Sequence, residues 1–332
     1  MIFIDKLIQN IKEKNNPSVI GLDPKIEYVP SYLKQKAFKE FGKNLIGASQ
    51  AILTFNKRII DAVYDVVPAI KPQLAYYEML GIEGLKVFEE TVKYAKEKGL
   101  LVIADGKRND IGSTAEAYSS AFLGKAMIDD GVYEAAFDVD ALTVNPYFGL
   151  DGIKPFVDDC NKYEKGIFIL IKTSNKTSGQ LQDLVIASDE NKTVENRKKT
   201  TENGTIYELV AEYVDEWGKG SIGEYGYSSI GAVVGATYPE QAKVVRRILK
   251  SAYILVPGYG AQGGSAKDVV SSFNCDGLGA IVNASRSIIC AYQSYFWKNT
   301  YCEESFDEAS RAEAIRMRDD INNALRLYLS VG

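Results

Sequence analysis

Residues 100–110 read LLVIADGKRND, an apolar run followed at once by two carboxylates and two basic side chains. The run has the length and composition of a buried strand, and side chains on a strand alternate between its two faces. Asp105 and Lys107 are therefore predicted to share one face as a neighbouring anion and cation, with Asp110 in the loop that follows. Residues 113–116 read STAE, the form of a capping box, which predicts a helix start. A strand, a charged turn and a helix in this order are typical of the active-site edge of an α/β fold.

A D-x-K pair on its own is more often a solvent-exposed salt bridge, so the rest of the chain has to support the site. Eight apolar runs alternate with helix-length segments, which predicts an α/β fold closed into a (β/α)8 TIM barrel. A doubly wound open sheet is the alternative. Polar residues follow the carboxyl end of every run, and this favours the barrel, because barrel enzymes gather their working groups there. The predicted strands are residues 18–22, 66–70, 100–104, 141–144, 167–171, 230–235, 253–256 and 280–282.

The spacing of the predicted elements favours one domain, residues 1–332, with an insertion between the fifth and sixth strands at residues 175–228. Within the insertion, residues at about 188–203 are polar with little apolar content and are predicted to form a mobile surface loop. The helices at residues 2–13 and 41–62 are expected to close the floor of the barrel and to flank its first strand. Helices are predicted at residues 2–13, 41–62, 85–98, 113–128, 206–217, 239–249 and 305–329.

Composition excludes several classes of protein. The net charge is -5 and there are no long basic runs, which argues against nucleic acid as a partner. No apolar run reaches the length of a membrane span and no signal peptide is recognisable, so a cytoplasmic location away from membranes is expected. The four cysteines lack C-x-x-C spacing, so neither disulfides nor zinc sites are predicted. The chain contains no histidine, so its chemistry is expected to depend on Asp, Glu, Lys, Tyr or Cys.

A second set of motifs predicts a phosphate site. Residues 256–264 read VPGYGAQGG after the seventh predicted strand, and residues 283–287 read NASRS after the eighth. Glycines such as Gly263 allow backbone N–H groups to face an anion, Gln262 offers an amide donor, and Arg286 offers a bidentate guanidinium. The loops after strands seven and eight are the usual phosphate site of a barrel. A glycine-rich loop alone is more often a turn, but Arg286 at the neighbouring strand end favours phosphate binding.

These motifs together resemble the orotidine 5'-phosphate decarboxylase family. The resemblance spans nearly the whole chain and is closest to the longer bacterial branch, often called type 2. It implies a (β/α)8 barrel that forms a homodimer with active sites at the subunit interface. It also implies the decarboxylation of orotidine 5'-phosphate (OMP) to UMP in pyrimidine biosynthesis, without a metal or organic cofactor. The motifs are D-x-K-x-x-D at residues 105–110, GLDP at residues 21–24, Lys71, KTSN at residues 172–175, PGYGAQGG at residues 257–264, and Arg286.

Individual roles follow from the same resemblance. Lys107 resembles the acid that protonates pyrimidine C6, and Asp105 resembles the carboxylate set against the departing substrate carboxylate. Lys71 and Asp110 resemble the remaining members of an alternating Lys-Asp-Lys-Asp array. The resemblance implies that Asp110 and Thr114 reach the partner's site, and that Asp23 binds a ribose hydroxyl. The other implied contacts are Ser174 with the pyrimidine, and Gln262, Gly263 and Arg286 with phosphate.

Two other functions compete with this interpretation. Magnesium-dependent sugar-phosphate enzymes share D-x-K-x-x-D but place a Glu two residues before it, where this chain has Ile103. A non-catalytic nucleotide-binding protein is the second alternative, but it has no reason to retain a costly cluster of like charges. The roles of Gln73 and Tyr259 stay open.

Overall fold

The computed structural model describes residues 1–186, 204–260 and 263–331. Eight parallel strands in this part of the chain close a barrel in the order β1-β10-β9-β8-β7-β6-β3-β2. The predicted fold class is therefore confirmed, and all eight predicted strands are present. They are β1 Ser18–Leu22, β2 Ala69–Pro72, β3 Leu101–Arg108, β6 Ala141–Val144, β7 Gly166–Lys172, β8 Ser228–Val234, β9 Ala252–Pro257 and β10 Ala280–Ala284.

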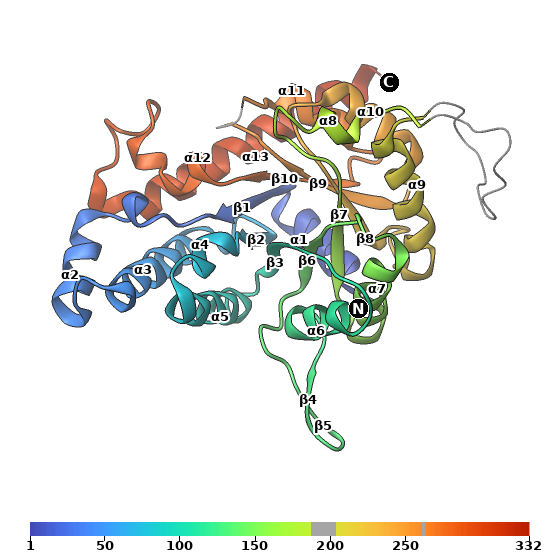
Figure 1. Ribbon diagram of the computed structural model, residues 1–332. Coiled ribbons are helices and arrows are strands. Elements are labelled where there is room, and N and C mark those ends of the chain that lie inside the picture. Colours follow the sequence, from blue (N-terminus) through green and yellow to red (C-terminus); the bar gives the residue numbers. More distant parts are fainter. Residues whose placement is uncertain (187–203, 261–262, 332) are drawn as a thin grey trace, which may run out of the picture.

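Helices surround the barrel on its outside (Figure 1). They are α1 Phe3–Lys14, α2 Ser31–Phe41, α3 Leu45–Val63, α4 Ala75–Glu78, α5 Gly81–Glu97, α6 Gly112–Phe122, α7 Leu150–Tyr163, α8 Gly179–Gln182, α9 Ile206–Gly218, α10 Pro239–Ile248, α11 Ala266–Val269, α12 Arg286–Ile289 and α13 Phe306–Val331. Short 3-10 helices lie at Ile26–Tyr28, Lys219–Ser221, Val270–Ser272, Ala291–Gln293 and Glu303–Ser305. No helix within residues 1–186, 204–260 and 263–331 is long and apolar enough to cross a membrane.

Two helix predictions were wrong in their bounds. The helix predicted at 41–62 is split, because Gly42 has a φ of 85° and the Asn44 side chain caps a new helix, α3, by accepting from the N–H of Gly47. The predicted capping box at 113–116 is not formed, since Ile111 is the N-cap and its side chain makes no capping bond. Helix α6 also ends at Phe122.

A hairpin begins at residues 126–128, which were predicted to end that helix. Its antiparallel strands are β4 Ala126–Asp129 and β5 Val132–Glu134, with Gly131 at a φ of 73° in the turn. The hairpin projects away from the body of the barrel (Figure 1). Its side chains are mostly exposed, so no apolar stripe of helical period marks it in the sequence.

Helix α1 closes the amino-terminal end of the barrel, as its sequence position suggested. Its buried side chains include Phe3, Leu7 and Ile8, which belong to one apolar cluster with the inward-facing residues of the strands. The ring of Phe3 meets that of Phe168 edge to face, with centroids 6.1 Å apart. Burial of the large side chains of this cluster, from one helix and the strand interiors, stabilises this end of the fold strongly. The open end of the barrel is thus the opposite one, where the strands terminate.

The connection from β7 to β8 contains α8 and α9. Helix α9 packs on both of these strands and so occupies the place of a regular barrel helix. The predicted mobile loop at about 188–203 lies outside the described residues.

Candidate active site

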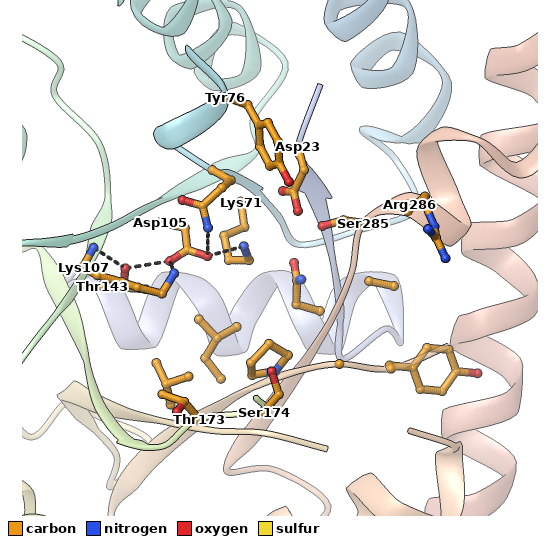
Figure 2. A pocket seen from close by; sticks show the side chains of 18 of the residues that line it. Asp23, Lys71, Tyr76, Asp105, Lys107, Thr143, Thr173, Ser174, Ser285 and Arg286 are labelled. Carbon is orange, nitrogen blue, oxygen red and sulfur yellow. Dashed lines mark hydrogen bonds and ion pairs between the residues drawn. The ribbon is translucent and has the colours of Figure 1, made fainter. Parts of the chain in front are cut away.

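A cavity of about 440 Å³ opens at the carboxyl ends of the barrel strands. Figure 2 shows side chains from several strands that point into it. The structure brings six of the predicted site residues to its wall, namely Asp23, Lys71, Asp105, Lys107, Ser174 and Arg286. These residues come from β2, β3, α12 and the loops after β1 and β7, so they are far apart in sequence and meet only because the barrel closes.

Asp105 lies at the centre of the charged part of this cavity. Its Oδ2 atom accepts a hydrogen bond of 2.7 Å from Lys71 Nζ, and its Oδ1 atom accepts one of 2.6 Å from Lys107 Nζ. The side chain of Lys71 is only 4% exposed, whereas that of Lys107 is 45% exposed and reaches into the cavity. The predicted contact between Asp105 and Lys107 is confirmed. One ammonium is thus buried as a fixed counter-ion, and the other faces the space that a ligand can occupy.

The backbone that carries Lys107 is not a regular strand. The pairing of β3 with β6 shifts register between Ala104 and Arg108, and Lys107 has a φ of 48°. A non-glycine residue in this left-handed region is uncommon and is retained where the surroundings hold it firmly. Here the N–H of Lys107 donates to Thr143 Oγ1 at 3.0 Å. The bulge therefore sets the position of the ammonium.

The charges in this cluster stabilise one another. Burial alone would raise the pKa of Asp105, but the ammonium groups of Lys71 and Lys107 outweigh it and hold that pKa well below its usual range. Burial alone would lower the pKa of Lys71, yet the carboxylates of Asp105 and Asp23 raise it above its usual value. Burial raises the pKa of Asp23, with Lys71 opposing the rise. Asp105 and Lys71 consequently stay ionised at neutral pH.

Sequence reasoning missed Thr143 and left Gln73 without a role. Thr143 Oγ1 donates to Asp105 Oδ1 at 2.9 Å, and Gln73 Nε2 donates to Asp105 Oδ2 at 2.9 Å. Asp105 therefore accepts four hydrogen bonds, two on each oxygen. A signal was available for Thr143, since it is the polar residue of an otherwise apolar run and alternation on β6 turns it inward. Asn283 was also missed; it lines the cavity at 5% exposure with an unpartnered Oδ1.

Arg286, the predicted phosphate cation, lines the other end of the cavity. Figure 2 shows Arg286 well away from Asp105, and it is exposed, with no ion pair to any described residue. The backbone of Gly258 lines the same end. Gly263 has a φ of 96°, and its N–H donates to the carbonyl of Gly260 at 2.9 Å. This N–H therefore closes the turn and is not available to an anion. Gln262 lies outside the described residues.

Three of the predicted residues that the structure describes do not line the cavity, namely Asp110, Thr114 and Gly263. Asp110 is partly exposed in the loop after β3 and accepts a hydrogen bond of 2.8 Å from the N–H of Ile111. Thr114 is exposed on the first turn of α6. Tyr259, whose role was open, packs in the core at 6% exposure and donates to Asp320 Oδ2 at 2.5 Å.

The arrangement favours chemistry in which a proton or a positive charge is delivered to a bound anion. The cavity combines the charged cluster at one end and a cation at the other with an apolar floor that includes Leu170, Val233 and Leu255. A low-dielectric floor strengthens the electrostatic interactions of groups above it. In the described part of the chain, no three His, Cys, Asp or Glu side chains are grouped so that they could hold a metal ion.

Comparison with known proteins supplies relatives along the whole chain. Residues 20–294 match the family described as "Orotidine 5'-phosphate decarboxylase / HUMPS family". An orotidine 5'-phosphate decarboxylase of Caldicellulosiruptor saccharolyticus is 42% identical over 323 residues, which cover 97% of this chain and 99% of the relative. One from Clostridium perfringens is 41% identical over 321 residues, which cover 97% of this chain and 98% of the relative.

Solved structures give the same result. A putative orotidine-monophosphate-decarboxylase from Toxoplasma gondii superposes with a TM-score of 0.73 at 27% identity, covering 98% of both chains. The OMP decarboxylase of Leishmania donovani superposes with a TM-score of 0.68 at 27% identity, covering 98% of this chain and 100% of the other.

Proposed function

Because this chain belongs to the orotidine 5'-phosphate decarboxylase / HUMPS family and is a carboxy-lyase that converts OMP to UMP in pyrimidine biosynthesis, we propose that Lys107 delivers the proton that replaces the substrate carboxylate at pyrimidine C6. The observation that carries the proposal is the Lys107 ammonium, which is held 2.6 Å from Asp105 and extends into the cavity. An ammonium in this position can act first as a fixed positive charge and then as an acid.

The reaction is balanced without any further reactant. The bond from C6 to the carboxylate breaks, CO2 leaves, and the electron pair stays on C6. No ring carbonyl is placed to delocalise that pair, so a nearby cation stabilises the transition state. The pair then takes a proton from Lys107 Nζ to form the C6–H bond of UMP, and the neutral lysine regains a proton from solvent.

Asp105 supports this chemistry in two ways. It keeps Lys107 beside it through a charge-assisted hydrogen bond, and its own negative charge faces the substrate carboxylate that has to leave. Lys71 and Gln73 fix the other carboxylate oxygen, which leaves Asp105 little freedom to turn away. As the bond to the carboxylate breaks, its negative charge passes to C6, where the Lys107 ammonium neutralises it, so the repulsion from Asp105 is relieved as the reaction proceeds.

The remaining cavity residues fit the other parts of OMP. We assign Asp23 to a ribose hydroxyl, Ser174 to the pyrimidine and Arg286 to the phosphate. The phosphate contact of Gln262, which lies outside the described residues, stays a prediction, and the N–H of Gly263 is already used by the Gly260 carbonyl. These groups are far apart in sequence but meet at one end of the barrel, because all of the described ones lie at the carboxyl ends of strands. Binding energy from the phosphate is then available to organise the charges at the reacting carbon.

Metal removal provides the direct test of the proposed chemistry. The purified protein is expected to convert OMP to UMP at an unchanged rate in excess EDTA, because the proposed acid and its supporting charges are all side chains. The conversion is followed by the change in ultraviolet absorbance of the pyrimidine. A rate that falls in EDTA and returns on addition of Mg²⁺ would contradict the proposal and favour a magnesium-dependent reaction.

We further propose that two chains form a homodimer in which Asp110 and Thr114 complete the partner's site. Asp110 and Thr114 lie outside their own cavity, and they follow β3, which carries Asp105 and Lys107. A residue that resembles a substrate ligand but does not reach its own cavity is explained if it serves the other subunit.

Mixing inactive variants tests this arrangement. Lys107→Ala and Asp110→Ala subunits are refolded together in equal amounts, so about half of the dimers are mixed, and in each of these one site is intact. Activity is expected to return to about a quarter of the wild-type value. Lys107→Ala mixed with Lys71→Ala is the matched control, because both residues line the same subunit's cavity and no intact site can form. Equal activity in both mixtures would rule out shared sites.

A further inference from the structure

The segment Thr173–Ser174 lines the cavity just after β7 ends. Ser174 is the residue proposed above to contact the pyrimidine, yet it lies on a loop that opens a long connection. Within the described residues, the N–H of Ser174 has no hydrogen-bond partner, so it is available to a ligand. A loop residue binds precisely placed groups only when the surrounding structure fixes it.

Gln182 fixes this segment from the end of α8. Its Oε1 atom accepts the N–H of Thr173 at 3.0 Å, and its Nε2 atom donates to Thr173 Oγ1 at 2.9 Å. One carboxamide thus satisfies both the backbone and the side chain of the residue next to Ser174. Thr173 Oγ1 passes its own proton on to Asn175 Oδ1 at 2.7 Å, so the turn is tied on both sides of Ser174.

An ion pair between a buried ammonium and an exposed carboxylate secures the position of Gln182 itself. Lys172, the last residue of β7, has a fully buried side chain, and its Nζ atom lies 2.6 Å from Oδ1 of Asp183. The ammonium also lies 4.4 Å from the centre of the Tyr238 ring. Because Asp183 follows Gln182 directly, this pair anchors the end of α8 to the barrel. Removing one partner of such a pair is strongly unfavourable, which makes the anchor a rigid one.

The opposite side of the segment is held by the next strand's loop. Thr237 Oγ1 donates to the Ser174 carbonyl at 3.2 Å, and the Tyr238 hydroxyl donates to the Asn175 carbonyl at 3.0 Å. Gly235 allows the close approach, since a Cβ atom there would lie 2.7 Å from the Cα atom of Ser174. The segment is therefore set between two fixed walls, and Gln182 supplies the contacts on the wall formed by α8.

We propose that Gln182 is a positioning residue for pyrimidine recognition, acting on the base of the nucleotide through Thr173 and Ser174. This inference rests on the proposed contact between Ser174 and the pyrimidine. Its effect is confined to ligands that carry a base, because Gln182 contacts neither end of the cavity where charge is concentrated. The rest of the cavity, including Asp105 and Arg286, shares no hydrogen bond with it.

The test compares two competitive inhibitors of OMP turnover, UMP and ribose 5-phosphate, which has no base. The Gln182→Ala variant is expected to raise the inhibition constant of UMP by about fivefold to twentyfold, as two hydrogen bonds that order the loop are lost. The constant for ribose 5-phosphate should stay within about twofold of wild type. Gln182→Glu keeps an acceptor for the Thr173 N–H and is expected to recover most of the affinity for UMP. Gln180→Ala is the matched control, because Gln180 is exposed on the same helix.

The outcomes separate this inference from the function on which it rests. If Gln182→Ala raises both inhibition constants equally, or if Gln182→Glu recovers none of the affinity for UMP, Gln182 has only a structural role and the inference fails. If Ser174→Ala raises the inhibition constant of UMP while Gln182→Ala does not, the pyrimidine contact of Ser174 is supported and the positioning role of Gln182 is ruled out. If Ser174→Ala and Gln182→Ala both leave the two inhibition constants unchanged, the side-chain contact with the pyrimidine and the positioning role both fall.

Discussion

The Lys107→Ala variant is expected to lose at least about 10⁴-fold in kcat, because the substitution removes both the acid and the fixed cation at the reacting carbon. Lys107 is the cationic group of the charged cluster whose side chain extends into open cavity, at 45% exposure. Lys71, the other cation, is 4% exposed and already paired with Asp105, so it cannot take over. The substitution should lower kcat more than the affinity for UMP, because UMP lacks the carboxylate whose departure Lys107 assists.

Single-turnover decay of OMP absorbance measures the residual rate, and the inhibition constant of UMP reports whether the site is intact. Lys154→Ala is the matched control, since Lys154 is an exposed lysine that pairs with Asp158 on the surface of α7. The control should behave as wild type. A Lys107→Ala rate within tenfold of wild type would show that the proton comes from elsewhere, and the proposed mechanism would have to be abandoned.

The Asp105→Asn variant is expected to lose both activity and stability. Its amide cannot balance the buried Lys71 ammonium, so the free energy of unfolding should fall by roughly 3 kcal/mol at pH 7. The amide also places a donor where four hydrogen bonds now converge on carboxylate oxygens. We expect kcat to fall by about 10³-fold. Urea unfolding and the OMP assay measure the two effects, and Asp129→Asn, at an exposed hairpin carboxylate, is the control.

The pH dependence of this stability difference follows from the direction of the pKa shift. The pKa of Asp105 is lower in the folded than in the unfolded chain, so the carboxylate contributes its full stabilisation above the unfolded pKa of about 3.9. The contribution is lost as the pH falls from there toward the folded value. Wild type and Asp105→Asn should therefore differ most at neutral pH and converge below about pH 4. A difference that stays constant down to pH 3 would mean that the charge of Asp105 is not what stabilises the fold.

The barrel could be predicted because each strand is a short, nearly continuous apolar run, which is typical of strands buried on both faces. The bounds were less certain for a physical reason. Val66 and Val67 were assigned to the second strand, but they lie in the turn after α3, where both amides donate to the Val63 carbonyl and both side chains are buried. Apolar content reports burial and cannot say whether the buried backbone is extended.

The charged pair was predictable from alternation, since Asp105 and Lys107 are two residues apart after an apolar run. The contacts that fix them were not predictable in the same way. Thr143 and Gln73 come from other strands, and their distances to Asp105 depend on how the barrel closes. The register shift in β3 also left no mark beyond Gly106, because a bulge is set by the pairing with β6. The two hydrogen bonds between Gln182 and Thr173 likewise depend on how α8 is anchored.

Because helix α1 closes one end of the barrel, the cavity has a single opening at the other end. Its apolar side chains pack directly beneath the layer that contains Val233 and Leu255, and these two residues also form the floor of the cavity. Carbon dioxide released at that floor has no passage through the base of the barrel and shares one mouth with the nucleotide. Before it escapes, the CO2 lies beside the electron pair on C6 and can recombine with that pair. The fraction of the reaction that goes forward to UMP thus depends on how fast Lys107 protonates C6 and CO2 escapes, compared with how fast CO2 recombines with C6.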